Sequence, residues 1–218
     1  MERNEIIEKL RLQLITQKAT LPEIQDEVKT FLAGGGRWVQ LRMKDTATET
    51  IIETGKQLLP LCREYGAVFI VNDHPDIALQ IGADGVHIGK NDISPTEARR
   101  ILGTGKIIGC TANTFEDIEQ LNGYPIDYIG LGPFRFTTTK KNLSPVLGAE
   151  GYRRIFAQVQ EHGITIPITA IGGITLEDVP PLNEAGARYY AVSGSISNAT
   201  DPTGTTKAFL REILKETI

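Results

Sequence analysis

The stretch AVFIVNDHPDIALQIGADGVHI, residues 67–88, contains the structural unit that repeats along the whole chain. Residues 67–71 form an apolar run of strand length, and residues 85–88 form a second one. Between them, Pro75 begins a segment that predicts a short helix over residues 75–81. Apolar runs without polar alternation are typical of parallel strands buried on both faces. The stretch therefore predicts a strand, a helix and a second strand of a parallel sheet.

The same alternation continues on both sides of this unit. Further strands are predicted at residues 12–16, 38–41, 107–110, 126–131, 167–171 and 189–192. Helical spacing of apolar residues follows them; Ile51, Leu58 and Cys62, for example, share one predicted face. About eight strands, each followed by a helical segment, predict an α/β fold of the (β/α)8 type, a TIM barrel. A doubly wound open sheet is the alternative, but the GxGxxG fingerprint after its first strand is missing.

The composition limits the classes of protein that fit this sequence. Of the 218 residues, 40% are hydrophobic and 23% are charged, which excludes a disordered chain. The net charge of −4 argues against nucleic acid or a membrane surface as the main partner. No secretory signal is visible, and the longest apolar runs are far shorter than the roughly 20 residues of a membrane helix. We therefore expect a cytoplasmic protein that acts on small molecules.

The chain also shows no linker, no shift in composition and no low-complexity tract, so we expect residues 1–218 to form a single domain. Cys62 and Cys110 lack metal-type spacing, and Cys62 is predicted to be a buried free thiol on an apolar helix face. The oligomeric state stays open, a homo-oligomer included.

Unusual polar residues stand at the carboxyl ends of seven predicted strands, where the loops of a barrel converge and its chemistry gathers. In chain order they are Gln40, Arg42 and Lys44; Asn72 and Asp73; His87 and Asp92; Thr111; Thr137, Thr138, Thr139 and Lys140; Gly172 and Gly173; and Ser193, Gly194 and Ser195. Any one of them alone has the ordinary explanation of a loop residue. Polar groups after seven successive strands predict one functional site at this end of the barrel, which we call the mouth.

Two loops of small residues predict a phosphate site. Gly172 and Gly173 follow the seventh predicted strand, and Ser193, Gly194 and Ser195 follow the eighth. Such loops expose backbone N–H groups, and barrels often bind phosphate at these two positions. A tight turn without a ligand is the alternative for the glycine pair alone.

Two carboxylates predict a metal site on the other side of the mouth. Asp73 and Asp92 follow the neighbouring third and fourth strands, and Mg²⁺ prefers few protein carboxylates together with phosphate oxygens and water. A solvated or helix-capping role is the alternative for Asp92. His87 lies within its strand, and we interpret it as a packed barrel residue instead of a ligand.

Three cations, Arg42, Lys44 and Lys140, complete the pattern. Arg grips phosphate oxygens with a planar fork and Lys supplies a point charge. Mg²⁺ together with several cationic side chains supplies more positive charge than a monophosphate requires. This charge suits a diphosphate, and especially one that leaves during the reaction. The pattern therefore predicts an enzyme that joins two phosphorylated small molecules.

The ordered set of motifs resembles the thiamine-phosphate synthase family. The segments that carry the resemblance are residues 40–44 (QLRMK), 71–73 (VND), 85–92 (GVHIGKND), 130–133 (GLGP), 137–140 (TTTK) and 170–174 (AIGGI). The resemblance implies a barrel transferase that uses Mg²⁺ to join 4-amino-2-methyl-5-(diphosphooxymethyl)pyrimidine to a thiazole phosphate. Diphosphate and thiamine phosphate are the implied products, and carbon dioxide is lost as well when the thiazole is carboxylated.

The resemblance also implies roles for individual residues. The pyrimidine diphosphate would be held by Gln40, Arg42, Lys44, Asn72, Thr111 and Lys140. The thiazole phosphate would be held by Thr137, Thr139, Gly173, Val192 and Ser193, and Mg²⁺ by Asp73 and Asp92. Arg42, Lys140 and Thr111 are the implied catalytic residues.

Some positions depart from the family pattern. Thr111 stands where the family commonly has Ser, Asn113 where it often has His, and Lys90 where it often has Gln, and the stretch 134–136 (FRF) is bulkier and more basic. Residues 134–148 are the natural candidate for a mobile lid. Two rival functions stay open. A thiazole tautomerase of the same superfamily would not need Asp73, Asp92 or residues 137–140, and the presence of these residues speaks against it. A non-catalytic barrel that binds a phosphorylated ligand would not need the two aspartates either.

Overall fold

A closed barrel of parallel strands forms the centre of the computed structural model, which describes residues 10–136 and 145–215. Within these residues, eight strands pair in chain order, and β1 also pairs with β8. The strands are β1 (Leu12–Ile15), β2 (Trp38–Leu41), β3 (Val68–Asn72), β4 (Gly85–Ile88), β5 (Ile107–Ala112), β6 (Tyr128–Leu131), β7 (Ile168–Ile171) and β8 (Tyr189–Val192). The (β/α)8 prediction is confirmed.

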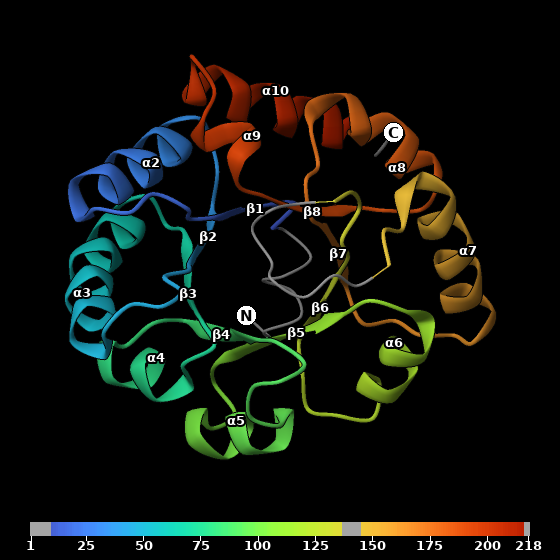
Figure 1. The fold of residues 1–218 in the computed structure, drawn as a ribbon, viewed down its shortest axis with the longest axis horizontal. Helices are drawn as coiled ribbons and strands as arrows, with labels where there is room; N and C mark the ends of the chain where they lie inside the picture. The colour runs from blue at the N-terminus through green and yellow to red at the C-terminus, as the bar shows by residue number, and fades with distance from the viewer. Residues whose placement is uncertain (1–9, 137–144, 216–218) are drawn as a thin grey trace.

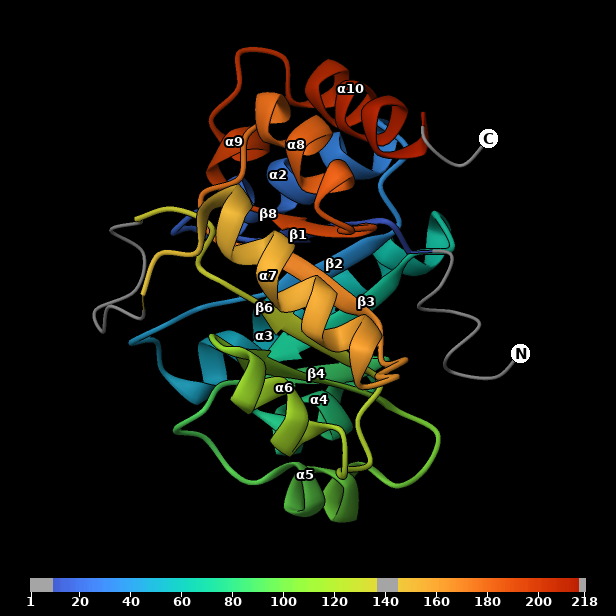
Figure 2. The same ribbon diagram turned by 90° about the vertical axis from the view of Figure 1, so that its right-hand side faces the viewer.

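Helices surround the barrel (Figure 1). They are α2 (Leu21–Ala33), α3 (Thr48–Glu64), α4 (Pro75–Ile81), α5 (Pro95–Leu102), α6 (Phe115–Leu121), α7 (Gly148–Glu161), α8 (Val179–Glu184), α9 (Gly194–Ser197) and α10 (Pro202–Leu214), with a 3-10 turn η1 (Leu176–Asp178) before α8. The side view shows α7 crossing the front of the barrel (Figure 2). Helices α2 and α10 pack against each other, so the outer layer closes where the chain begins and ends. No helix among the described residues has the length and apolar character needed to cross a membrane.

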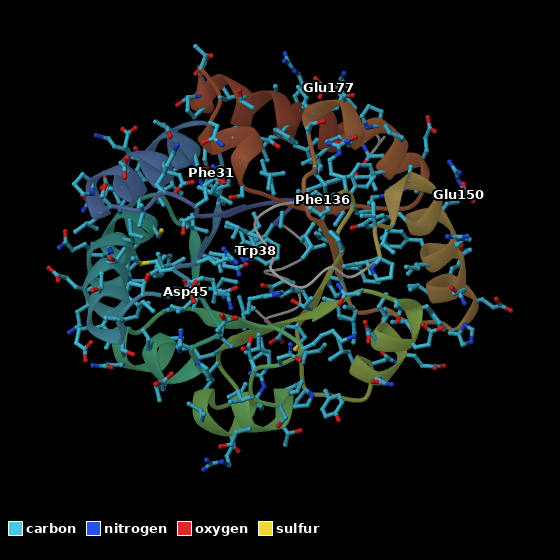
Figure 3. The ribbon with its side chains drawn as sticks, in the orientation of Figure 1. Phe31, Trp38, Asp45, Phe136, Glu150 and Glu177 are labelled. Carbon is cyan, nitrogen blue, oxygen red and sulfur yellow. The ribbon has the colours of Figure 1, made fainter. Side chains whose placement is uncertain are left out.

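The apolar residues form two layers, one inside the barrel and one between strands and helices. Trp38 lies within the ring of strands and meets Tyr128 edge to face at 4.8 Å between ring centroids (Figure 3). Phe31, on α2, belongs to the larger outer layer and is fully buried. Replacing such a ring by Ala costs about 3–5 kcal/mol of stability. The outer layer therefore holds the helices in place around the strands that carry the polar mouth.

Sequence and structure differ at a few element ends. Strand β6 begins at Tyr128, two residues later than predicted; the preceding Asp127 donates its amide to the Ile108 carbonyl and accepts from the Ile108 amide through its carboxylate, each at 2.8 Å. The sequence gives no signal for the short helix α9, since four residues carry no periodicity. The buried free thiol predicted at Cys62 is confirmed, and burial raises the pKa of the Cys62 and Cys110 thiols to about 12. Both thiols are therefore protonated and unreactive at neutral pH.

Candidate active site

The carboxyl ends of β2, β3 and β4 border a wide, open cavity of about 660 Å³. Its lining is strongly charged and includes Lys44, Asp45, Asp73 and Asp92. Lys44 comes from the loop after β2, Asp73 directly follows β3, and Asp92 lies in the loop after β4. The two aspartates that the sequence singled out are thus brought together on one side of the mouth.

Asp73 is the more buried of the two carboxylates. Its backbone has a φ of 68°, an uncommon left-handed conformation for a residue with a side chain, and its amide donates to the carbonyl of His87 at 2.7 Å. Burial raises the pKa of the Asp73 carboxyl, and the neighbouring Asp92 carboxylate raises it further. The ammonium group of Lys44 forms an ion pair with Asp73 and acts in the opposite direction. A second positive charge at this position would relieve the repulsion between the carboxylates.

Asp92 is placed by a tight turn. Its Oδ2 atom accepts a hydrogen bond from the Gly89 amide at 2.6 Å, and a Cβ at Gly89 would lie 2.9 Å from the same oxygen. Two carboxylates with open space around them suit a hard cation such as Mg²⁺, which keeps several water or phosphate ligands. The described residues contain no cluster of three or more His, Cys, Asp or Glu side chains that would complete an all-protein metal cage. The donor set therefore fits a cation that is shared with a ligand.

Gln40 and Asn72 form a polar pair at the ends of neighbouring strands. The Gln40 Nε2 atom donates to Asn72 Oδ1 at 2.7 Å, and Gln40 is only 2% exposed. Its Oε1 atom is buried and has no hydrogen-bond partner within the part of the chain that the structure describes. A buried acceptor without a donor is costly, so this atom is suited to a ligand N–H group.

Thr111 is connected to the barrel interior through His87. The Thr111 hydroxyl lies 3.0 Å from His87 Nε2, and the Tyr128 hydroxyl lies 2.9 Å from His87 Nδ1. Both ring nitrogens are thus engaged, and His87 is 7% exposed. The prediction that His87 is a packed barrel residue is confirmed. Its contacts connect the Thr111 side chain, near the end of β5, to the interior of the barrel.

A second, smaller cavity of about 110 Å³ lies at the ends of β7, β8 and β1. Backbone and small side chains make up much of its wall, with Gly172 and Gly173 from the loop after β7 and Ser193 after β8. Gly172 has a φ of 97° and Gly173 a φ of 75°. A Cβ at Gly172 would lie 2.6 Å from Pro133 Cα, so only glycine fits there. Both predicted phosphate loops thus border one cavity.

Arg135, in the loop after β6, binds the loop after β7 that contains Gly172 and Gly173. Its guanidinium donates to the carbonyl of Gly173 at 2.7 Å and to the Asp178 carboxylate at 2.7 Å. Asp178 in turn accepts from the Thr175 amide at 2.7 Å. The basic residue that departs from the family pattern therefore supports the loop on which the predicted phosphate site depends.

Arg42 lies between the two cavities. It lines the smaller one together with Thr16 and Ser193. Burial lowers the pKa of its guanidinium, and the charges of Asp73 and Asp45, which border the larger cavity, offset part of that shift. An Arg side chain nevertheless keeps its charge in proteins. A permanent positive charge therefore separates the two halves of the mouth.

The comparisons with known proteins agree with this arrangement. Residues 12–196 match the family model of thiamine monophosphate synthase. The thiamine-phosphate synthase of Phocaeicola vulgatus is 50% identical over 92% of this chain and 97% of its own length. The chain belongs to the thiamine monophosphate synthase family. A thiamine-phosphate synthase of Pyrococcus horikoshii is 37% identical, covering 97% of this chain and 98% of the relative.

A solved structure extends the likeness to the whole fold. The thiamine phosphate pyrophosphorylase of Pyrococcus furiosus matches with a TM-score of 0.81 at 32% identity, covering 97% of this chain and 96% of that one. The resemblance inferred from the motifs is thereby confirmed, and the chain is a transferase of the thiamine monophosphate synthase family.

The family motifs fall on both cavities. Lys44, Asp73 and Asp92 line the larger one, and Arg42, Gly173, Val192 and Ser193 line the smaller one. Thr137, Thr138, Thr139 and Lys140, and part of the predicted lid, lie outside the described residues. Sequence reasoning gave no role to Thr16, whose hydroxyl accepts from the Arg42 amide at 3.0 Å, or to Arg135. The position of Thr16 at the end of the first strand was the one available signal.

Proposed function

We propose that this chain joins 4-amino-2-methyl-5-(diphosphooxymethyl)pyrimidine to a thiazole phosphate and forms thiamine phosphate and diphosphate. The observation that carries the proposal is the division of one mouth into two anion subsites. One has two carboxylates and a lysine in an open cavity, and the other has glycine and serine loops around a small one. A transferase with two phosphorylated substrates requires this division.

The larger cavity would receive the diphosphate. Asp73 and Asp92 would hold Mg²⁺, which when bound neutralises charge on the leaving diphosphate. Lys44 would then leave its ion pair with Asp73 and bind the diphosphate oxygens, because a cation bound to the aspartates neutralises the charge that attracts the lysine. Lys140 is proposed to add a further charge.

The pyrimidine ring would lie against the ends of β2, β3 and β5. The unpartnered Gln40 Oε1 would accept from the exocyclic amino group, while Asn72 holds the Gln40 amide in place. The Thr111 hydroxyl, placed by His87, would face the same substrate. These contacts would orient the methylene carbon toward the neighbouring subsite.

The smaller cavity would hold the monophosphate tail of the thiazole. Gly173, Val192 and Ser193 would supply backbone N–H and hydroxyl donors there, and we assign Thr137 and Thr139 to the same substrate. A tail that takes no part in bond changes needs only to be held. The thiazole nitrogen would thereby face the methylene carbon.

Bond changes would need no protein nucleophile. The C–O bond to the diphosphate breaks, the electron-rich aminopyrimidine stabilises the cation that remains, and the thiazole nitrogen forms the new C–N bond. Arg42, between the subsites, would stabilise the negative charge that develops on the leaving oxygen. A carboxylated thiazole phosphate would also lose carbon dioxide.

The test mixes the protein with the pyrimidine diphosphate, the thiazole phosphate and Mg²⁺, and follows diphosphate release and thiamine phosphate formation. Both products should form in equal amounts, and EDTA should stop the reaction. Turnover of the thiazole phosphate alone, without the pyrimidine, would indicate a tautomerase. Binding of both substrates without products would indicate a non-catalytic barrel.

A further inference from the structure

A buried acidic residue lies behind the smaller cavity. Glu27, on α2, is only 5% exposed. Its carboxylate accepts hydrogen bonds from the Gln17 amide at 3.2 and 3.3 Å, from the Lys18 amide at 3.5 Å and from the Ser197 hydroxyl. Gln17 and Lys18 follow β1, and Ser197 ends α9. One carboxylate therefore joins the loop after β1 to the helix after β8.

The side chain of Gln17 extends this connection to the cavity wall. The Ser193 hydroxyl donates to Gln17 Oε1 at 3.2 Å. The same amide packs against Gly194, where a Cβ would lie 3.5 Å from Gln17 Oε1. Ser193 lines the smaller cavity. Glu27 thus reaches a wall residue through Gln17, without lining the cavity itself.

Three groups donate hydrogen bonds to the Glu27 carboxylate: the backbone amides of Gln17 and Lys18, which can only donate, and the Ser197 hydroxyl. An ionised carboxylate accepts at both oxygens, whereas a Gln side chain would turn an NH₂ group toward at least one of these N–H or O–H groups. Burial raises the pKa of the Glu27 carboxyl, and the hydrogen bonds from Ser197, Gln17 and Lys18 and the charge of Lys18 offset only part of that rise. The loop after β1 and α9 are therefore joined through a single buried acceptor.

A negative charge close to an anion site would by itself weaken anion binding. We propose that Glu27 is a positioning residue for the thiazole-phosphate subsite, which fixes Gln17 and α9 so that Ser193 meets the monophosphate. The inference rests on the proposed function. Glu27 would therefore strengthen binding of the thiazole phosphate by fixing Ser193, although its negative charge alone would weaken that binding.

The test is Glu27→Gln, measured by steady-state kinetics with each substrate varied in turn. The KM for the thiazole phosphate should rise about tenfold, the effect expected when hydrogen bonds to a charged group are lost. The KM for the pyrimidine diphosphate and kcat should change by less than about twofold. If the charge alone mattered, the KM for the thiazole phosphate would fall. An unchanged or lower value in a folded variant, or an equal rise for both substrates, overturns the proposal.

A matched control lies at the opposite end of the barrel. Asp127, 2% exposed, also accepts a backbone hydrogen bond, from Ile108, and pairs with Arg99 at 2.7 Å. Asp127→Asn should lower the melting temperature and leave both KM values unchanged. A selective rise in this variant would show that any lost buried carboxylate disturbs the subsite, and would overturn the specific role of Glu27.

Two further results keep the proposal open to refutation if Glu27→Gln does not fold. Gln17→Ala and Ser197→Ala each remove one part of the connection and should raise the same KM selectively. An absence of that rise in both folded variants overturns the proposal. A wild-type protein without turnover would refute the proposed function instead, so the two failures are distinguishable.

Discussion

The two halves of the mouth differ in the groups that would bind the substrates: charged side chains in one half and backbone groups in the other. The half at β2, β3 and β4 is wide and relies on charged side chains, among them an ion pair between Lys44 and Asp73. The half at β7, β8 and β1 is narrow and relies on backbone with positive φ angles, held by Arg135 and Asp178. The half at β2, β3 and β4 thus carries charges on side chains that can change rotamer, and the half at β7, β8 and β1 carries backbone dipoles in fixed positions.

This difference matches what each substrate group would undergo. A diphosphate that departs gains charge, so the half that receives it needs side chains which can exchange partners. A monophosphate that only anchors a molecule keeps its charge, and rigid N–H groups hold it at little entropic cost. Substitutions confined to one half should therefore affect one substrate and spare the other.

The largest effect is expected for Asp92→Ala. Loss of one carboxylate should lower kcat/KM about 10²–10³-fold, the size of effect seen when a stabiliser of transition-state charge is removed. Diphosphate release measures it, and Asp26→Asn, an exposed carboxylate on α2, is the control. Full activity of folded Asp92→Ala, or full activity in EDTA, would refute the metal assignment.

The second largest effect is expected for Gly172→Ala, which changes the half of the mouth at β7, β8 and β1. Its Cβ would clash with Pro133 at 2.6 Å, so we expect the KM for the thiazole phosphate to rise about twentyfold, as for a misplaced binding group. Gly163→Ala is matched to it, since Gly163 also has a positive φ (63°) but a Cβ added there would meet no atom within 4 Å. Both variants should lose about 1–2 kcal/mol of stability from the backbone conformation. Only Gly172→Ala should change a KM; equal kinetics in the two would contradict the role of the loop.

Lys44→Met should raise the KM for the pyrimidine diphosphate about tenfold, through the loss of one charge contact. It should also shift the pH dependence of cation binding. Burial and Asp92 raise the pKa of Asp73, so falling pH protonates Asp73 and weakens binding of a divalent ion. Lys44 lowers that pKa, and removing it should move the midpoint to higher pH. Titrations with Mn²⁺ at several pH values measure the shift, and a midpoint that moves down would contradict the ion pair.

The smallest effect is expected at Thr111. Thr111→Val removes the hydroxyl that meets His87 and should lower kcat about fivefold, the loss of one neutral hydrogen bond. Thr111→Ser keeps the hydroxyl found commonly in the family and should stay within about twofold. If the two variants lose activity equally, the methyl group and not the hydroxyl matters.

The sequence was informative where neighbours along the chain decide the outcome. Apolar runs such as residues 85–88 specify strands, and the polar residue after a strand, such as Asp73, must then face the mouth. Contacts between distant residues could not be predicted in this way. Glu27 reaches Ser197 across 170 positions, and Arg135 reaches Asp178 across 43. The position of Arg42 between two cavities depends likewise on strands that only the closed barrel brings together.

The most direct test of two separable subsites is calorimetric. Asp92→Ala and Gly172→Ala are each titrated with thiazole phosphate and, separately, with diphosphate in the presence of Mg²⁺. Asp92→Ala should lose the diphosphate titration and keep the affinity for thiazole phosphate, and Gly172→Ala should show the reverse. A folded variant that loses both affinities together would contradict the account.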